Sequence, residues 1–279
     1  MPIHDQGYRR YTGRRIVGGR SWWVIARAGI LERVRERRFL ALLLFAWSPF
    51  VVRAVQIYVA SNFSQASFLA PSAETFREFL DQQGIFVFFV TIFVGAGLIA
   101  GDLRANALQI YLSKPLTRVE YIAGKLATLL VFLVAVTWAP AILLLFLQMM
   151  FAGSAAFIRA NLFLIPAITL CAAIQVAMSA FMMLALSSLS KNRRFVAMMY
   201  AGIVFFTAAL YQALRMMTTS TRWALISPRD TLDVIADGIF RSSGPALAPF
   251  PLALGVVVAI IGASIWILAR RVRGVEVVT

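Results

Sequence analysis

The sequence predicts an all-α integral membrane protein with six transmembrane helices and both termini in the cytoplasm. Three observations support this fold class. Hydrophobic residues make up 61% of the 279 positions and charged residues only 14%, which is too apolar a composition for a soluble domain. The apolar residues gather into six long runs, and most basic residues lie in the segments on one side of those runs. Because hydrocarbon offers the backbone no hydrogen-bond partner, such runs must cross a membrane as helices.

The six apolar runs are the predicted spans. They are 17 to 28 residues long, and roughly 20 residues of helix cross a bilayer. The runs cover residues 39–60, 85–101, 126–151, 162–189, 195–214 and 251–269. None of them alternates between apolar and polar residues as barrel strands do. We therefore assign residues 39–271 to one transmembrane domain, with residues 1–38 and 272–279 as cytoplasmic tails.

The distribution of basic residues orients these spans. Of the 27 Lys and Arg residues, 20 lie in the two tails and in the two loops on the same side, and six lie in loops on the opposite side. Short segments rich in Lys and Arg stay in the cytoplasm. Both tails are therefore expected there, where the net charge of +15 faces anionic lipid headgroups. This placement makes membrane lipids the expected partner of the basic residues and argues against nucleic acid.

Residues 21–38, before the first span, are predicted to form an amphipathic helix in the inner membrane interface. The apolar residues that share one face at helical spacing are Trp23, Ala26, Ile30 and Val34. Basic residues cluster elsewhere on the helix. The adjacent rings of Trp22 and Trp23 suit the headgroup region, where aromatic side chains are enriched. This helix is expected to lie along the membrane surface.

Two segments on the outer side are predicted to be short helices that rest on the outer surface or dip into it. Residues 72–84 begin with Ser72 as an N-cap and end with Gly84 as a stop. Residues 227–240 begin with Ser227 as an N-cap and repeat apolar residues at helical spacing.

Residues 102–125, between the second and third spans, are predicted to form a helix, a break and a second helix. Residues 103–112 can form a short helix with an apolar face, and the Ser-Lys-Pro sequence at 113–115 breaks it. Thr117 and Glu120 then form a capping box for the next helix, which continues into the third span. A helix, break and helix at the inner membrane face presents a stiff projection to the cytoplasm.

The residues of this loop also stand in a particular order. A span ends in the acidic Asp102, and a basic residue and an apolar helix follow; then come Leu-Ser-Lys-Pro-Leu-Thr-Arg at 112–118, Glu120-Tyr121 and Gly124-Lys125. This order resembles the permease subunits of ABC-2 type transporters. The chain departs from that family at residues 105–107, Ala-Asn-Ala, where members often carry a glycine followed by Ser or Thr. We refer to residues 102–125 as the coupling loop.

The resemblance implies a permease subunit of an ABC exporter in the bacterial cytoplasmic (inner) membrane. Two permeases would pair, as two copies or as related chains, and two separate cytoplasmic ATPase subunits would bind below them. This multi-pass chain would then be non-catalytic and hold no cofactor, with ATP and Mg bound to the ATPase subunits. The coupling loop would supply a coupling helix, and the candidate coupling residues are Asp102, Arg104, Leu108, Tyr111, Lys114, Pro115, Arg118 and Glu120. The mostly apolar interior favours an amphipathic or lipid-like cargo.

Two other classes of protein stay open on the residues alone: an ion-coupled carrier or channel subunit, and the membrane anchor of a multi-subunit enzyme. The first would ordinarily carry acidic residues inside its spans, and none of the 12 acids lies centrally in one. The second would need clustered His, Cys or carboxylate groups, and the chain has one cysteine and one histidine. The sequence also lacks a G-x-x-x-x-G-K-[ST] phosphate loop. We assign no catalytic, cofactor-binding or metal-binding residue.

Arg53 is a charged residue inside the first predicted span. An unpaired charge near the centre of a span costs about 2.5 to 3.5 kcal/mol on the insertion scale. Two interpretations remain open. Arg53 lines the transport pathway or binds an anionic lipid headgroup, or its side chain extends outward to the interface.

Overall fold

The computed structural model describes residues 21–63, 72–107, 116–151, 162–218, 220–241 and 248–272. Every secondary-structure element within these ranges is a helix. Six helical segments there are long and apolar enough to cross a membrane, which confirms the predicted all-α membrane fold. They cover Arg37–Asn62, Ala73–Arg104, Arg118–Phe151, Leu164–Leu189, Arg193–Thr218 and Phe250–Arg271.

The first and third spans each consist of two helices that meet at a bend. The first span is α2 (Arg37–Ala46) and α3 (Ser48–Asn62), and the third is α7 (Arg118–Val136) and α8 (Trp138–Phe151). A proline lies in the first turn of α3 and of α8. A first-turn N–H has no partner within its own helix, so proline is tolerated there. Each bend therefore coincides with the start of a new helix at a proline.

The second span is the most irregular. It begins with α4 (Ala73–Val90), passes through the π-helical turn η2 (Thr91–Gly95) and ends with the short α5 (Ala100–Arg104). The prediction of a separate outer helix at 72–84 was correct in its start, because Ser72 caps α4 in a capping box with Thr75. Its end was wrong.

Gly84 lies inside α4 and does not end it. A glycine costs a helix interior only about 1 kcal/mol relative to alanine. After Gly84, the side chains of Phe86, Val87 and Val90 are buried against neighbouring helices and keep the chain helical. The predicted outer helix is therefore the outer end of the second span.

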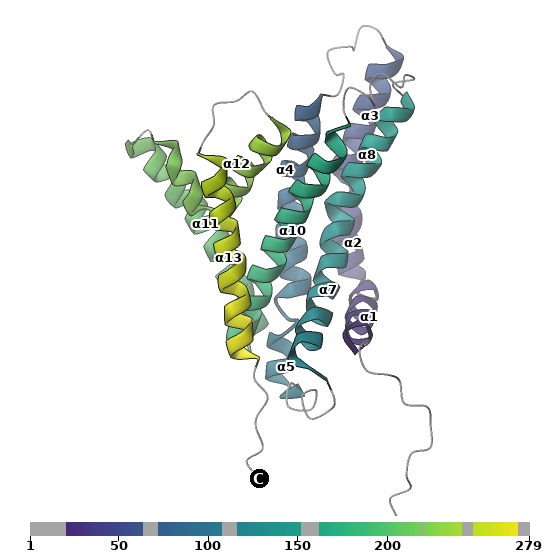
Figure 1. Cartoon of the computed structure of the whole chain (residues 1–279). Coiled ribbons are helices and arrows are strands. Elements are labelled where there is room, and N and C mark those ends of the chain that lie inside the picture. The colour runs from purple at the N-terminus through teal and green to yellow at the C-terminus, as the bar shows by residue number, and fades with distance from the viewer. Residues whose placement is uncertain are drawn as a thin grey trace, which may run out of the picture.

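The fourth span, α10 (Leu164–Leu189), lies at the centre of the bundle. It packs against α4, α7, α8, α11 and α13, and most of its side chains are buried. The fifth span, α11 (Arg193–Thr218), leans away from the other helices (Figure 1) and buries few side chains. The last span is α13 (Phe250–Arg271), which packs closely on α10.

Three helices mark the two ends of the bundle. The first described helix, α1 (Ser21–Val34), lies at the same end as α5 and the C-terminal end of α13 (Figure 1). At the other end, α12 (Pro228–Phe240) follows the 3-10 helix η3 (Thr221–Ile226) and packs on α4, α10, α11 and α13. Ser227 accepts a hydrogen bond from the Asp230 N–H, so the predicted N-cap of this helix is confirmed. The assignment of the α5 end to the cytoplasm stays a prediction.

Candidate coupling site at the α5 end of the bundle

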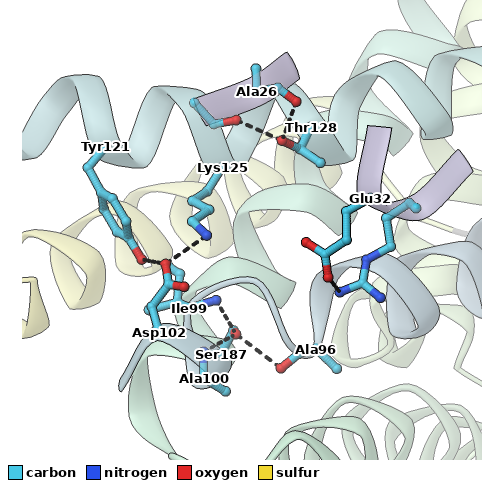
Figure 2. A network of polar contacts seen from close by, with 12 residues as sticks. Ala26, Glu32, Ala96, Ile99, Ala100, Asp102, Tyr121, Lys125, Thr128 and Ser187 are labelled. Atoms are coloured by element: carbon cyan, nitrogen blue, oxygen red, sulfur yellow. Dashed lines mark hydrogen bonds and ion pairs between the residues drawn. The ribbon is translucent and has the colours of Figure 1, made fainter. Parts of the chain in front are cut away.

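Asp102 joins the end of the second span to the start of the third. Its Oδ2 atom lies 2.7 Å from Lys125 Nζ and accepts a hydrogen bond of 2.6 Å from the Tyr121 hydroxyl (Figure 2). Tyr121 is fully buried, and the side chains of Asp102 and Lys125 are only 18% and 13% exposed. Hydrogen bonds to an ionised acceptor are the stronger kind, and more so where water is partly excluded. The contact holds α5 and α7 together on either side of the coupling loop.

One side chain of α10 forms hydrogen bonds with the backbone of the turn between η2 and α5. Ser187 accepts hydrogen bonds from the N–H groups of Ile99 and Ala100, at 3.1 and 3.0 Å, and donates to the Ala96 carbonyl at 3.1 Å (Figure 2). A hydroxyl has one proton and two lone pairs, so this set uses its full capacity. Ser187 is fully buried. A break in a helix at membrane depth needs such internal partners, and the serine supplies them.

The start of α7 confirms the predicted capping box. The Thr117 hydroxyl accepts a hydrogen bond from the Glu120 N–H at 3.2 Å, and the Glu120 carboxylate accepts one from the Thr117 N–H at 3.0 Å. The first turn of α7 is therefore closed by its own side chains. Arg118 and Val119, between the two capping residues, point outward, and Val119 is 75% exposed.

The helix α1 docks on α7 at two glycines. A Cβ atom at Gly124 would lie 2.7 Å from the Trp22 carbonyl oxygen and 2.8 Å from Ile25 Cβ, and one at Gly29 would lie 2.8 Å from Thr128 Oγ1. Any side chain would collide with the Thr128 side chain at Gly29 and with the α1 backbone at Gly124, so glycine permits the close approach of the two helices. The Thr128 hydroxyl donates to the Gly124 carbonyl at 3.0 Å within the contact.

The face of α1 that packs on α7 differs from the predicted apolar face. Ala26 is fully buried, but Trp23 and Val34 are 50% and 40% exposed. The packed face is centred on Ala26 and Gly29 because the two small residues allow close approach, whereas the bulky side chains stand off the bundle. Ala26 of the predicted apolar face therefore packs on protein, Trp23 and Val34 do not, and the placement of α1 in the membrane interface stays a prediction.

The comparison with protein families decides among the three classes that the residues left open. Residues 23–272 match a family described as ABC-2 family transporter protein. The chain belongs to the ABC-2 transporter family. No curated protein matches the chain significantly. The family assignment makes this chain a multi-pass permease component of an ABC transporter, and it implies association with ABC ATPase partners.

The structure of this ABC-2 permease brings only part of the predicted coupling residues together. Asp102 and Glu120 both contact α7, the first from α5 and the second as a cap. Arg104 and Arg118 are exposed at the ends of α5 and α7. The remaining four, Leu108, Tyr111, Lys114 and Pro115, lie outside the described residues.

The predicted start of the short helix in the coupling loop was wrong. Leu103 belongs to α5, which ends at Arg104, and Asn106 has a positive φ of 51°. Asparagine tolerates the left-handed region better than most residues, and a residue in that region ends a helix. Residues 105–107 are also where the sequence departs from the family pattern.

Several contact residues had no predicted role. Tyr121, Gly124 and Lys125 were part of the family resemblance, but no function was assigned to them. Their roles follow from contacts with α1 and α5, which lie far away in the sequence. The available signal was the spacing: Tyr121 and Lys125 lie one turn apart on α7 and share a face. Nothing in the local sequence pointed to Ser187.

Arg53 lies away from the coupling site, on α3. Its guanidinium donates to the Glu78 carboxylate of α4 at 3.0 Å, and its side chain is 15% exposed. This partner within the chain neutralises the charge, so no lipid headgroup is needed to do so. Glu78 could not be identified from the sequence because it lies in a different span.

Proposed function

We propose that this ABC-2 permease exports its cargo from the cytoplasm and is driven by two separate ATPase subunits that bind the α5 end of the bundle. ATP and Mg would bind to those subunits and not to this chain. Export is the direction that the resemblance of the coupling loop to ABC exporters implies. The single observation that carries the choice of site is the contact of Asp102 with Lys125 and Tyr121.

This contact supports a path for force from the coupling loop into the spans. Because Asp102 is tied to α7, a push on the loop moves α5 and α7 together. Ser187 ties α5 to the central helix α10, and the close glycine contact ties α1 to α7. A displacement at the loop would therefore reach three parts of the bundle through packed contacts.

The exposed residues beside the joint are the proposed contacts of the ATPase. Arg104, Arg118 and Val119 point away from the bundle. Exposed basic side chains next to an apolar one suit the polar rim and apolar centre of a protein interface. Among the contacts that the structure gives for the described residues, neither arginine has an ion pair or a hydrogen bond.

A second permease, either a copy of this chain or a related one, is also part of the proposal. Large apolar side chains are exposed along α3 and α11, and they include Val51, Val55, Phe205 and Phe206. Lipid covers apolar surface on any membrane protein, and a second permease would cover part of it here. The pair would sit in the bacterial inner membrane with its α5 ends in the cytoplasm.

Purification of the chain together with the ABC ATPase encoded next to it tests the proposal. Native mass spectrometry of the complex in detergent should report two permeases and two ATPases. The double variant Arg104→Glu and Arg118→Glu should lose the ATPase, because two cations at the contact become anions. A single-charge control at the same end, Arg271→Glu, alters the exposed end of α13 and should keep it.

Two results would contradict the proposal. One is a double variant that retains the ATPase with unchanged affinity. The other is vanadate-sensitive ATP hydrolysis by the purified permease alone, because the chain has no phosphate loop.

A further inference from the structure

A cavity of about 590 Å³ lies between α4, α10, α11 and α12. Sites for small organic molecules have volumes of roughly 300 to 1,000 Å³. The cavity extends from charged residues on α12 and the outer turns of α4 to the middle of α10 and α11. It is therefore large enough for a ligand and is lined by residues from different depths of the bundle.

The walls of the cavity are mostly apolar, and aromatic rings dominate one side. The rings come from α4 and α11 and belong to Phe86, Phe88, Phe89, Tyr200 and Phe205. Phe88 stacks on Tyr200 at 5.7 Å between ring centroids and meets Phe205 edge to face at 5.1 Å. Rings hold an apolar body through large contact areas, and their faces also attract cations.

The charged residues at the α12 end of the cavity leave an acid unpaired. Arg77 forms an ion pair with Asp237, and Arg229 lies 3.3 Å from Asp81. Asp233 also lines the cavity. Among the contacts that the structure gives for the described residues, Asp233 has no ion pair and no hydrogen bond. Both arginines at the mouth are thus paired with other carboxylates, and the carboxyl group left for a ligand is that of Asp233.

The environment of Asp233 raises the pKa of its carboxyl group to about 7. Burial is the main cause, and repulsion from Asp81 and Asp230 adds to it, while Arg229 and Arg77 act in the opposite direction. A positively charged ligand beside Asp233 would offset both the burial and the repulsion. Binding of a cation would then release a proton, so the affinity should rise with pH.

We propose that this cavity binds an amphipathic cation, with its apolar body against the aromatic rings of α4 and α11 and its positive charge beside Asp233. The inference deepens the proposed function by naming the class of cargo. It rests on that function only for the claim that the bound molecule is transported. Anionic and neutral amphiphiles of the same size should bind more weakly, because only a cation compensates the carboxylate.

Binding of two probes of matched shape tests the proposal. Tetraphenylphosphonium and tetraphenylborate have nearly the same size and opposite charge. Saturable binding to the purified full-length chain in a neutral detergent should favour the cation by about tenfold or more. The affinity for the cation should increase between about pH 6 and about pH 8, where Asp233 loses its proton.

Two variants separate the carboxylate from its surroundings. Asp233→Asn keeps the shape of the side chain and should weaken binding of the cation about tenfold and remove the pH dependence. Asp230→Asn is the matched control, because Asp230 lies one turn earlier on α12 and does not line the cavity. The control should bind the cation nearly as tightly as the wild type and keep the pH dependence, because it leaves Asp233 and the cavity lining in place.

The outcomes are distinct. Equal affinity for the two probes, absence of saturable binding, or unchanged binding in Asp233→Asn would each overturn the proposed site. The probe is also tested for ATP-driven transport by the reconstituted complex. Binding without transport would keep the cation site and contradict its role in export. Transport of other cargo without binding of the cation would keep the exporter and overturn the site.

Discussion

The two ends of the bundle differ in whether their carboxylates have partners within the chain. At the α5 end, Asp102 has an ammonium and a hydroxyl partner, both within 2.7 Å. At the α12 end, Asp237 and Asp81 use the two arginines, and Asp233 has no such partner among the contacts of the described residues. The pKa of Asp233 is accordingly raised to about 7.

This difference separates two kinds of task. A carboxylate with all its partners inside the chain fixes the geometry around it and resists change, as a joint that transmits force must. A carboxylate without a partner beside a cavity is destabilising until a ligand supplies the missing charge. This is why we propose the satisfied end of the permease for mechanical coupling and the unsatisfied end for recognition of cargo.

The largest expected effect in this comparison is that of Lys125→Met. The substitution leaves the Asp102 carboxylate without its cation at a site that is 18% exposed. Removal of one partner of a buried ion pair is strongly destabilising, and we expect a loss of about 2–4 kcal/mol here because some solvent remains. Equilibrium unfolding in mixed detergent micelles measures it. The double variant with Asp102→Asn should recover part of the loss, and an additive double variant would show that the pair is not coupled.

Gly124→Ala should be the next largest effect. The new methyl group would meet the Trp22 carbonyl oxygen at 2.7 Å, and a backbone atom cannot rotate away. Overpacking of this kind costs about 1–3 kcal/mol and should loosen α1 from α7. The matched control is Gly202→Ala on α11, where no atom lies within 4 Å. The control should be neutral or stabilising by up to about 1 kcal/mol. Equal unfolding free energies for the two variants would contradict the close packing of α1 on α7.

Asp233→Asn should change stability in the direction opposite to Lys125→Met. The pKa of Asp233 is about 7 in the folded chain and about 3.9 in an unfolded one. The folded state therefore holds its proton more tightly, and wild-type stability falls as pH rises from about 4 to about 7. At pH 8 the variant should be about 1–2 kcal/mol more stable than the wild type, because the buried charge is gone.

The check is unfolding of the two proteins across this pH range. The stability difference between them should be small below about pH 4 and should grow until about pH 7. A difference that does not vary with pH would mean that Asp233 does not titrate in this range, and the contrast between the two ends of the bundle would be lost.

Glu78→Gln should have the smallest effect. Glu78 is 50% exposed, and an ion pair with so exposed a partner contributes less than about 1 kcal/mol. Gln56 also lies within 3.4 Å of Arg53 and remains in place. The same measurement should therefore show a loss of unfolding free energy below that value. The loss should be smaller still at high salt, because salt screens the pair. A loss as large as that of Lys125→Met would mean that the pair of Arg53 and Glu78 behaves as a buried ion pair despite the exposure of Glu78.

Much of the fold could be predicted because the signals are local. A run of about 20 apolar residues carries its own evidence of a span, and the Thr117–Glu120 capping box depends on residues three apart. The same local rule misjudged Gly84, since burial of the residues after it outweighs the preference of glycine for helix ends. It also did not identify the face of α1 that packs on α7, because apolar periodicity does not tell lipid from protein as the neighbour.

The candidate site was predicted only in part for the same reason. Asp102 and Glu120 stood out through a family pattern, which covers adjacent residues. The partner of Asp102 lies 23 positions later, and Ser187 lies more than 80 positions from the break that it satisfies. Contacts between spans depend on which helices become neighbours, and hydropathy does not encode that choice.

The sequence by itself determined that this chain is a six-span helical membrane protein, and the order of residues at 102–125 gave its resemblance to ABC-2 permeases. Composition and periodicity suffice for the six spans, because the bilayer forces every apolar run of sufficient length into a helix. Only the tertiary structure decided which charges are paired. The separation of a satisfied Asp102 from an unsatisfied Asp233 arises from the packing of α4, α7 and α12, and packing depends on the shapes of side chains from distant parts of the chain.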